Sequence, residues 1–324
     1  IHCSKRTGHG TQTLAEAVQN SCNPAFIAIG QRLGTDLFYQ YFQAFGYTEM
    51  TGVDLPSEEK GINWGDDMTG VDLAVASFGQ RFTVTPIQMI TAFAATINGG
   101  KLLQPYVVQT VTAADGTVVE NTEPTVVRQV VSQETSDKCR EILTSVVMAE
   151  KGTGKNARQA GYTIGGKTGT SETTVPGEVV VSFMGFAPAD DPQVVVLIAF
   201  DSPTPVVPGS DYTSHGFYIS GGNITAVTAV PMLADMLDYL GVEKEYSAQD
   251  SAAIDVSTPR VTGLTVAEAE DALEEKGLGY RTIGEGETVT SQIPASGASV
   301  PGLPACSRGR RGCPCERPSA PTAS

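Results

Sequence analysis

Polar capping residues followed by apolar residues at helical spacing predict several helices in the first 240 residues. Thr13 and Glu16 form a capping box, in which two side chains satisfy the unpaired backbone N–H groups of a helix start. Asn23-Pro24 is typical of an N-cap followed by the first helical residue. Signals of this kind predict helices over about 23–33, 85–98, 135–148 and 226–240.

Strand signals concentrate between residues 161 and 201. The runs 162–171, 178–187 and 193–201 are rich in β-branched residues, and a turn sequence, Ala189–Pro192, joins the last two. Two adjacent strands with a short turn predict an antiparallel hairpin. Helices, then a hairpin, then a long helix indicate an α+β fold with helices packed on an antiparallel sheet.

Composition and charge narrow the range of functions. The 324 residues are 40% hydrophobic and 18% charged, which is enough apolar material for a folded core and excludes global disorder. The net charge of −15 repels phosphate backbones, so we expect no nucleic-acid partner. No apolar run is long enough to span a bilayer.

The chain divides into three zones of different composition. Residues 1–246 are mixed and globular, 255–302 form a short acidic unit, and 303–324 are basic and rich in Pro, Arg and Cys. We expect the last zone to be a disordered or frameshifted tail. Cys313 and Cys315 lack further ligands at zinc-site spacing, so we expect neither a metal nor a cofactor. The start at Ile1 suggests a fragment of a longer protein.

The most distinctive motif is Lys167-Thr168-Gly169-Thr170, which follows Gly165-Gly166 in a predicted strand. Lys167 supplies a cation, Thr168 and Thr170 supply hydroxyl groups, and Gly169 allows close approach to the backbone. Backbone N–H groups on such an edge can also stabilise an oxyanion. The pattern suits a carboxylate-binding strand edge. The alternative is a glycine-flanked surface strand with incidental polar residues.

A second motif, Ser21-Cys22-Asn23, falls between two predicted helices. In a non-helical turn the hydroxyl and the amide can face one cleft, where Ser21 relays a proton and Asn23 holds a substrate amide. The alternative is structural, with Asn23 capping the following helix. S-x-N followed by K-T-G is part of the motif set of serine β-lactamases and penicillin-binding proteins.

The longer blocks around these motifs resemble class B penicillin-binding proteins of the stage V sporulation protein D type. The resemblance covers about residues 1–246 and implies the penicillin-binding-protein and serine β-lactamase-like fold. The blocks that carry it are Gly8–Gly34, Leu73–Met89, Gly152–Glu172 and Val181–Pro203.

The acidic unit resembles a PASTA domain, a small module of one helix and several strands found in the same family. Thr265 and Glu268 form another capping box, and Gly277 falls at the helix end. The resemblance implies recognition of cell wall or β-lactams. The alternative is a structural appendage. We expect its last strand to be incomplete at about residue 302.

The family resemblance implies a specific role for each motif residue of the site. Ser21 and Lys167 would assist proton transfer and Asn23 would hold the acyl-side amide. Thr168 and Thr170 would bind the substrate carboxylate beside Gly169, and the Thr170 N–H would join the oxyanion hole. Glu172 stands where many relatives have Gln.

The nucleophile of the family is the serine of S-x-x-K, upstream of S-x-N. Here the motif occurs only at Ser57–Lys60, downstream and in a Pro- and charge-rich stretch, so we interpret Ser57 as a coincidence. We therefore expect a D,D-transpeptidase fragment that lacks its nucleophile and is inactive by itself.

The parent would act on peptidoglycan stem peptides and bind β-lactams, at the extracytoplasmic face of the cell membrane, together with cell-wall, division or sporulation machinery. Two alternatives remain: a non-catalytic protein that binds muropeptides or β-lactams, and a hydrolase of the serine β-lactamase class.

Overall fold

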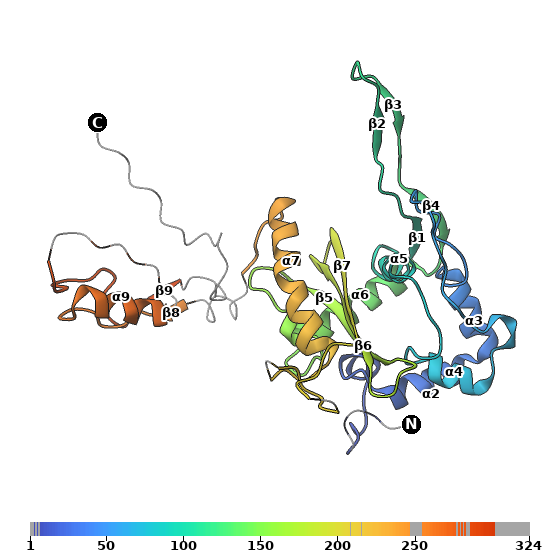
Figure 1. Ribbon diagram of the computed structural model, residues 1–324, viewed down its shortest axis with the longest axis horizontal. Helices are drawn as coiled ribbons and strands as arrows, with labels where there is room; N and C mark the ends of the chain where they lie inside the picture. The colour runs from blue at the N-terminus through green and yellow to red at the C-terminus, as the bar shows by residue number, and fades with distance from the viewer. Residues whose placement is uncertain are drawn as a thin grey trace. The chain divides into compact units, whose positions relative to one another are not determined.

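The computed structural model of the chain describes residues 3, 5, 7–207, 209–214, 216–246, 255–276, 278, 280, 282 and 286–301. The chain forms two compact units, Ile1–Glu243 and a second that begins at Lys244 (Figure 1). The domain limits 1–246 and 255–302 stay predictions. The tail 303–324, with Cys313 and Cys315, and the predicted helix end at Gly277 lie outside the described residues.

A three-stranded antiparallel sheet forms the centre of the first unit. Its strands are β5 (Gly165–Glu172), β6 (Val179–Ala187) and β7 (Val194–Asp201), in the order β5-β6-β7. β6 pairs with β5 over residues 179–186 and with β7 over residues 180–187, which is nearly its whole length. The predicted hairpin and the α+β class are therefore confirmed, although the first strand begins three residues later than its apolar pattern indicated.

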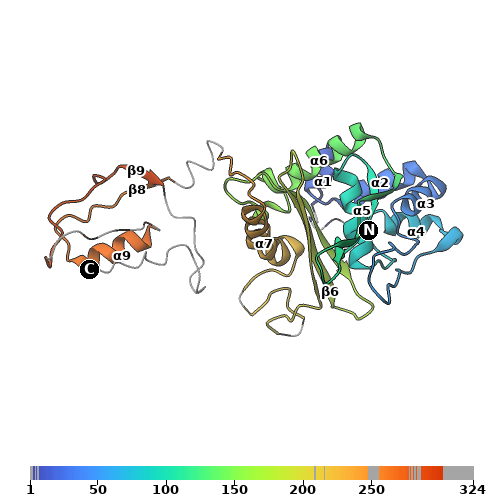
Figure 2. The same ribbon diagram turned by 90° about the horizontal axis from the view of Figure 1, so that it is seen from above.

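Helices cover both faces of this sheet. Figure 2 shows α7 (Ala226–Tyr239) on one face, with α5 (Pro86–Ile97) and α6 (Gln133–Met148) on the other. Phe183 packs with Leu233 of α7, whereas Phe186 packs with Ile97 of α5. Both phenylalanine side chains are completely buried, and each contributes about 1.5–3 kcal/mol through apolar burial. β6 is apolar on both faces because each face carries its own core.

Two of the helices that precede the sheet, α1 (Leu14–Gln19) and α5, begin at the predicted caps. α1 starts with the Thr13–Glu16 capping box, and α5 starts with the same arrangement at Thr85 and Gln88. Further helices are α2 (Asn23–Leu33), α3 (Thr35–Ala44) and α4 (Gly70–Ala76). A separate aromatic cluster, in which Phe42 contacts Tyr47, Trp64 and Phe82, packs this region.

Two strand pairs lie between α5 and α6, where the sequence predicted none. β1 (Lys101–Gln104) pairs with β4 (Thr125–Gln129), and β2 (Thr110–Thr112) pairs with β3 (Val118–Asn121). They form a ribbon that projects from the body of the first unit (Figure 1). All the residues of β2 and β3 are exposed, so neither strand shows the alternation of buried and exposed positions that marks a half-buried strand.

In the described part of the second unit there are one helix and one strand pair. α9 (Val266–Glu275) begins at the Thr265–Glu268 capping box, as predicted. β8 (Asp255–Ser257) pairs antiparallel with β9 (Ser299–Pro301). Apolar burial here is modest and involves Val261, Ala269 and Leu278.

Candidate functional site

The turn between α1 and α2 presents the Ser21-Cys22-Asn23 motif. α1 ends at Gln19, and the Cys22 N–H donates to the Ala17 carbonyl at 3.0 Å, which reverses the chain within a few residues. Ser21 adopts φ +47°, in the left-handed region that non-glycine residues seldom occupy. Such strain persists only where the surrounding structure imposes it, and it frequently marks functional positions.

The predicted cap of α2 is wrong by one residue. Cys22 is the N-cap and makes no side-chain capping bond, while Asn23 is already the first helical residue, followed by Pro24. The backbone of Cys22 has the extended conformation of an N-cap, because the tight reversal ends there. Asn23 is therefore not the N-cap of α2, so the alternative in which Asn23 serves to cap this helix is wrong.

The Lys167-Thr168-Gly169-Thr170 motif lies on β5, at an edge of the three-stranded sheet formed by the described residues. The glycine pair before it makes room for two aromatic rings of β6. A Cβ atom on Gly165 would come within 2.2 Å of the Phe186 ring, and one on Gly166 within 2.7 Å of the Phe183 ring. Only glycine allows β5 to pair so closely with β6 at these two positions.

One hydrogen bond joins the two motifs. The Lys167 ammonium donates to Ser21 Oγ at 2.8 Å, across 146 positions of sequence, and to the Thr168 carbonyl at 2.7 Å. Loss of solvation on burial lowers the pKa of Lys167 from 10.5 to about 8. A lysine with that pKa exchanges protons near neutral pH far more readily than an exposed one. The hydroxyl and the amine are thus arranged for proton transfer.

Thr153, which the sequence analysis did not single out, connects the same two elements. Its N–H donates to the Gln19 carbonyl at the end of α1, at 3.1 Å. Its hydroxyl accepts a hydrogen bond from the Thr168 hydroxyl at 3.0 Å. Thr153 therefore fixes the spacing between the Ser21 turn and β5. In the sequence, the flanking Gly152 and Gly154 indicate an unusual backbone conformation, but they do not predict the contact of Thr153 with Thr168.

The other half of the motif is open on one side and closely packed on the other. Thr170 is exposed, and Gly169 pairs with Ser182 of β6. A π-helical turn, η3 (Gly221–Thr225), packs on this pair. A Cβ atom on Gly221 would lie 2.2 Å from the Ser182 carbonyl oxygen and 2.6 Å from that of Gly169. The π-helical turn η3 is thus packed tightly against the backbones of β5 and β6.

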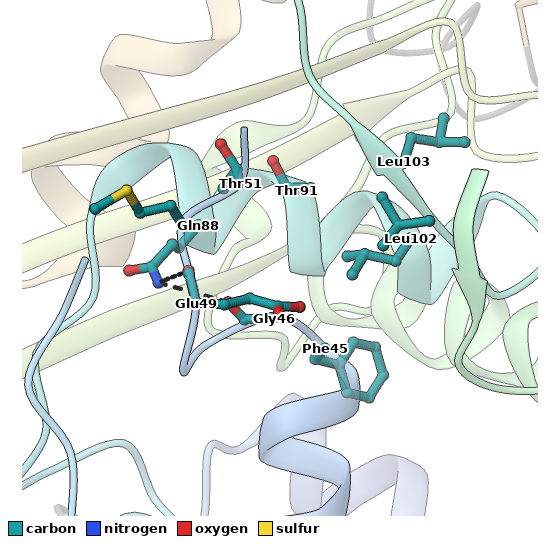
Figure 3. A pocket seen from close by; sticks show the side chains of 10 residues that line it. Phe45, Gly46, Glu49, Thr51, Gln88, Thr91, Leu102 and Leu103 are labelled. Atoms are coloured by element: carbon teal, nitrogen blue, oxygen red, sulfur yellow. Dashed lines mark hydrogen bonds between the residues drawn. The ribbon is translucent and has the colours of Figure 1, made fainter. Parts of the chain in front are cut away.

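Other candidates lie apart from this geometry. Ser57 sits in an exposed turn at φ +62°, and no helix begins there to place Lys60 one turn beyond it. Glu172 is exposed at the end of β5. A small cavity of about 30 Å³, lined in part by Glu49, Gln88 and Leu102, belongs to the packing around α5 and contains no predicted site residue (Figure 3).

Comparison with known proteins identifies the class to which this fold and motif pair belong. Residues 2–216 match the penicillin binding protein transpeptidase domain, and residues 256–302 match the PASTA domain. The chain therefore belongs to the penicillin-binding protein transpeptidase family and is of the class B type, which confirms the predicted family and fold.

Among individual proteins, the chain is 39% identical over 314 residues to stage V sporulation protein D of Bacillus subtilis (strain 168), which covers 93% of this chain and 46% of that protein. It is 34% identical over 207 residues to penicillin-binding protein PbpB of Mycolicibacterium smegmatis, covering 60% of this chain and 32% of that one. The chain thus spans less than half of the length of either relative.

Two solved structures show the same fold. Penicillin binding protein 3 from Mycobacterium tuberculosis, complexed with ampicillin, aligns with TM-score 0.67 and 28% identity, over 76% of this chain and 55% of that one. The D,D-transpeptidase domain of a peptidoglycan glycosyltransferase from Eggerthella lenta aligns with TM-score 0.62 and 26% identity, over 75% and 57%. Within the described ranges of this chain, no helix has the length and apolar character to cross a membrane.

Proposed function

We propose that this chain carries the S-x-N and K-T-G part of a peptidoglycan D,D-transpeptidase site. The observation that carries the proposal is the 2.8 Å hydrogen bond between Lys167 and Ser21. It brings both motifs to one place, with an amine whose pKa is lowered to about 8. A lysine with a lowered pKa beside a serine at positive φ is typical of a functional site.

The proposed roles follow from the chemistry of each group. Ser21 and Lys167 move a proton between the attacking and leaving groups, since roughly a tenth of an amine with this pKa is neutral at pH 7. Asn23, at the start of α2, holds the amide on the acyl side of the substrate.

In this proposal, β5 binds the carboxylate end of the substrate. The exposed Thr170 and the Thr168 hydroxyl bind the carboxylate, and Gly169 lets it approach the strand. The Thr170 N–H contributes to the oxyanion hole, where a fixed donor stabilises the charge that develops on the carbonyl oxygen.

The acylating serine is not among these residues. Ser57–Lys60 is the one S-x-x-K of the 324 residues, and it lies in an exposed turn. We propose that this chain by itself does not form an acyl-enzyme, since no suitable serine is present to make the covalent bond.

The proposed substrates are peptidoglycan stem peptides that end in D-Ala-D-Ala, and the proposed inhibitors are β-lactams, which mimic that end. Support comes from the relatives named D,D-transpeptidases and from the fold shared with a protein complexed with ampicillin. We propose that the parent works at the extracytoplasmic face of the membrane with sporulation or division machinery. Of the relatives, the stage V sporulation protein favours sporulation.

The first test measures ampicillin binding to the chain by amide NMR. The expected result is reversible, saturable shifts at Ser21 and Thr168–Thr170, without a covalent adduct in intact-mass spectra. Lys167→Met should abolish these shifts, while Lys138→Met, which removes an exposed lysine of α6, should leave them unchanged. A stable penicillin adduct on this chain would contradict the proposed inactivity, and β-lactam turnover would favour the hydrolase.

A second test separates a transpeptidase from a non-catalytic binding protein. The source reading frame is sequenced upstream of Ile1, and a chain extended to an S-x-x-K, if one is encoded, is labelled with fluorescent penicillin. We expect covalent labelling that Ser21→Ala or Lys167→Met slows by about 100-fold. Absence of labelling in the extended chain would favour the binding protein.

A further inference from the structure

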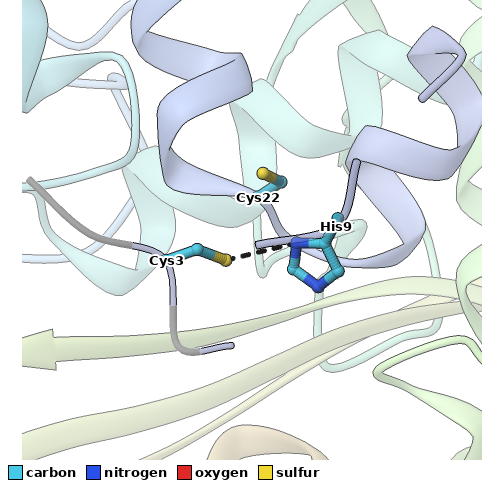
Figure 4. Close-up of side chains that lie close together, drawn as sticks. All are labelled: Cys3, His9 and Cys22. Atoms are coloured by element: carbon cyan, nitrogen blue, oxygen red, sulfur yellow. Dashed lines mark hydrogen bonds between the residues drawn. The ribbon is translucent and has the colours of Figure 1, made fainter. Parts of the chain in front are cut away.

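The ribbon of β1–β4 and β2–β3 bears a cavity that shares no residue with the candidate catalytic site. That site includes the Ser21 turn, beside which side-chain atoms of Cys3, His9 and Cys22 lie within 4.8 Å of one another (Figure 4). The ribbon cavity has a volume of about 440 Å³, which is within the range of ligand-binding pockets. It is lined by residues from three segments, 52–54, 104–111 and 120–125.

Hydrogen bonds join the walls of the ribbon cavity to one another. The Asp54 carboxylate accepts the N–H groups of Val107 and Val108 at 2.7 and 2.8 Å. The Gln104 side-chain amide donates to the Gly52 carbonyl at 2.7 Å. The pairing of β2 with β3 ties the third segment to the second. Because these bonds already hold the walls together, a ligand does not have to order them on binding.

The lining of the ribbon cavity is negatively charged. It contains three carboxylates, Asp54, Glu120 and Glu123, and none of the described residues that line it is Lys, Arg or His. Backbone hydrogen bonds lower the pKa of Asp54, so this group stays charged at neutral pH. The whole stretch from Leu102 to Val127 likewise contains no Lys or Arg. The ribbon cavity therefore attracts a cationic group.

Apolar side chains lie beside these carboxylates. Val111 is opposite Glu120 in the β2–β3 pairing, so both side chains are on the face that lines the cavity. Val108 and Tyr106 line the same cavity, and Val108 and Val111 are 45% and 41% exposed. Lysine and arginine side chains cover apolar surface with their aliphatic stems while the charged ends meet polar groups. The combination suits a Lys or Arg side chain.

The strands of the ribbon also have free edges. Each strand of the β2–β3 pair has one edge to which no other strand of the described chain is added. Exposed strand edges are templates for pairing with another chain, and Lys or Pro residues usually protect them. Neither β2 nor β3 contains either residue type. An extended peptide can therefore add to this sheet, as in other cases of recognition by β-strand addition.

We propose that the ribbon is a docking surface for an extended, basic segment of a partner protein. One Lys or Arg side chain of that segment enters the ribbon cavity beside Glu120 and Glu123, with its stem on Val111, and the backbone of the segment extends the β2–β3 sheet. A second copy of this chain, with a net charge of −15, and an anionic membrane surface are both repelled by these carboxylates.

The proposal uses no residue of the two catalytic motifs. Its failure would leave the proposed transpeptidase site untouched, and the reverse also holds.

The experiment selects binders from a displayed library of short random peptides, in parallel on the full chain and on its Glu120→Gln/Glu123→Gln variant. Only the unchanged chain should enrich peptides in which Lys or Arg is flanked by apolar residues. The most enriched peptide is then synthesised with a fluorophore, and its Kd is measured by anisotropy.

The double substitution should raise this Kd by about tenfold or more, because it removes two charged partners of the cation. Glu134→Gln/Glu141→Gln is the matched control, since it removes the same charge from the exposed face of α6. It should change the Kd by no more than about twofold.

A pair of valine substitutions separates the ribbon cavity from unspecific apolar contact. Val111 lines the cavity, whereas Val119 is 68% exposed and does not line it. Val111→Thr should weaken the peptide by about threefold or more, and Val119→Thr should leave the Kd unchanged, although both substitutions keep a β-branched residue. Circular dichroism establishes that every variant is folded.

Three results would overturn the proposal. The first is a selection on the unchanged chain that yields no basic consensus, and the second is a peptide that binds both double variants, or both valine variants, equally well. The third is occupation of the ribbon by another segment. Sedimentation that detects a dimer lost in Glu120→Gln/Glu123→Gln would assign the ribbon to a second copy, and tighter peptide binding after removal of residues 303–324 would assign it to the basic end of this chain.

Discussion

At the scale of single residues, the candidate site depends on backbone positions as much as on functional groups. Ser21 is held at positive φ, and Gly165, Gly166 and Gly221 occupy places where a Cβ atom would collide with a ring or a carbonyl oxygen. The motif residues were identifiable from the sequence because their types and spacing are distinctive. Thr153 was not, since its role consists of two contacts with distant segments.

The pKa of Lys167 provides a direct test of the site geometry. We expect the Lys167 side chain to titrate at about pH 8, because burial penalises its charged form, and NMR of lysine side chains with Lys167→Arg for assignment measures this. Its folded pKa lies below its unfolded value of 10.5, so the unfolded chain binds more protons between about pH 8 and 10.5. The contribution of Lys167 to stability therefore rises with pH across that window.

Lys138 is the matched control for this titration. Its exposed ammonium pairs with Glu134 at 2.7 Å, and that hydrogen bond raises the pKa of Lys138. The two lysines should thus depart from the ordinary value in opposite directions. A Lys167 midpoint at or above 10.5 would show that the amine is solvated and not buried against Ser21.

Gly221 tests the packing behind β5. Gly221→Ala should destabilise the first unit by about 1–3 kcal/mol, because the added Cβ overlaps two backbone carbonyl oxygens that cannot rotate away. Urea unfolding measures the change. Gly70→Ala is the control, since nothing lies within 4 Å of its Cβ position at the exposed start of α4, and it should be neutral or slightly stabilising. Equal effects of both substitutions would contradict the packing argument.

At the scale of elements, sequence signals succeeded where a local rule decides the structure. The Thr13, Thr85 and Thr265 capping boxes all form. The ribbon of β1–β4 and β2–β3 was missed, because its strands lack a consistently buried face and their pairing is a property of the folded chain. The cap of α2 was displaced to Cys22 by the tight reversal after α1.

The side chain of Gln88, on α5, is hydrogen-bonded to the loop that contains Glu49 and Gly61. It is 1% exposed, its amide N–H donates to the Glu49 carbonyl at 2.7 Å, and its oxygen accepts from the Gly61 and Thr85 N–H groups. Gln88→Leu should destabilise the first unit by more than about 2 kcal/mol, because it leaves several buried groups without partners. Thermal and urea unfolding measure the loss.

Gln133 is the control for that substitution. It is an exposed residue at the start of α6, so Gln133→Leu should change the free energy of unfolding by no more than about 0.5 kcal/mol. If Gln88→Leu were equally mild, its hydrogen bonds would not be what holds the loop on α5.

At the scale of the whole molecule, the two compact units should unfold as separate cooperative transitions, since each has its own core. Thr85→Ala and Thr265→Ala remove the same capping hydroxyl, one in each unit, and each should cost about 1 kcal/mol. Trp64, the single tryptophan of the chain, reports the first unit by fluorescence. Amide NMR of Ala269 reports the second unit.

Thr85→Ala should lower the midpoint of the Trp64 transition and leave that of Ala269 unchanged, and Thr265→Ala should do the reverse. A shift of both probes by either substitution would mean that the two units unfold as one.

The sequence by itself determined the family, the α+β class, most helix starts and the identity of the motif residues. Each of these depends on residue type and short-range order, which local hydrogen bonding and apolar periodicity translate directly into structure. Tertiary structure alone decided the Lys167–Ser21 contact, the bridging role of Thr153 and the meeting of Cys3, His9 and Cys22. These depend on distances between segments far apart in the chain, which packing of the helices against the sheet sets and no local pattern encodes.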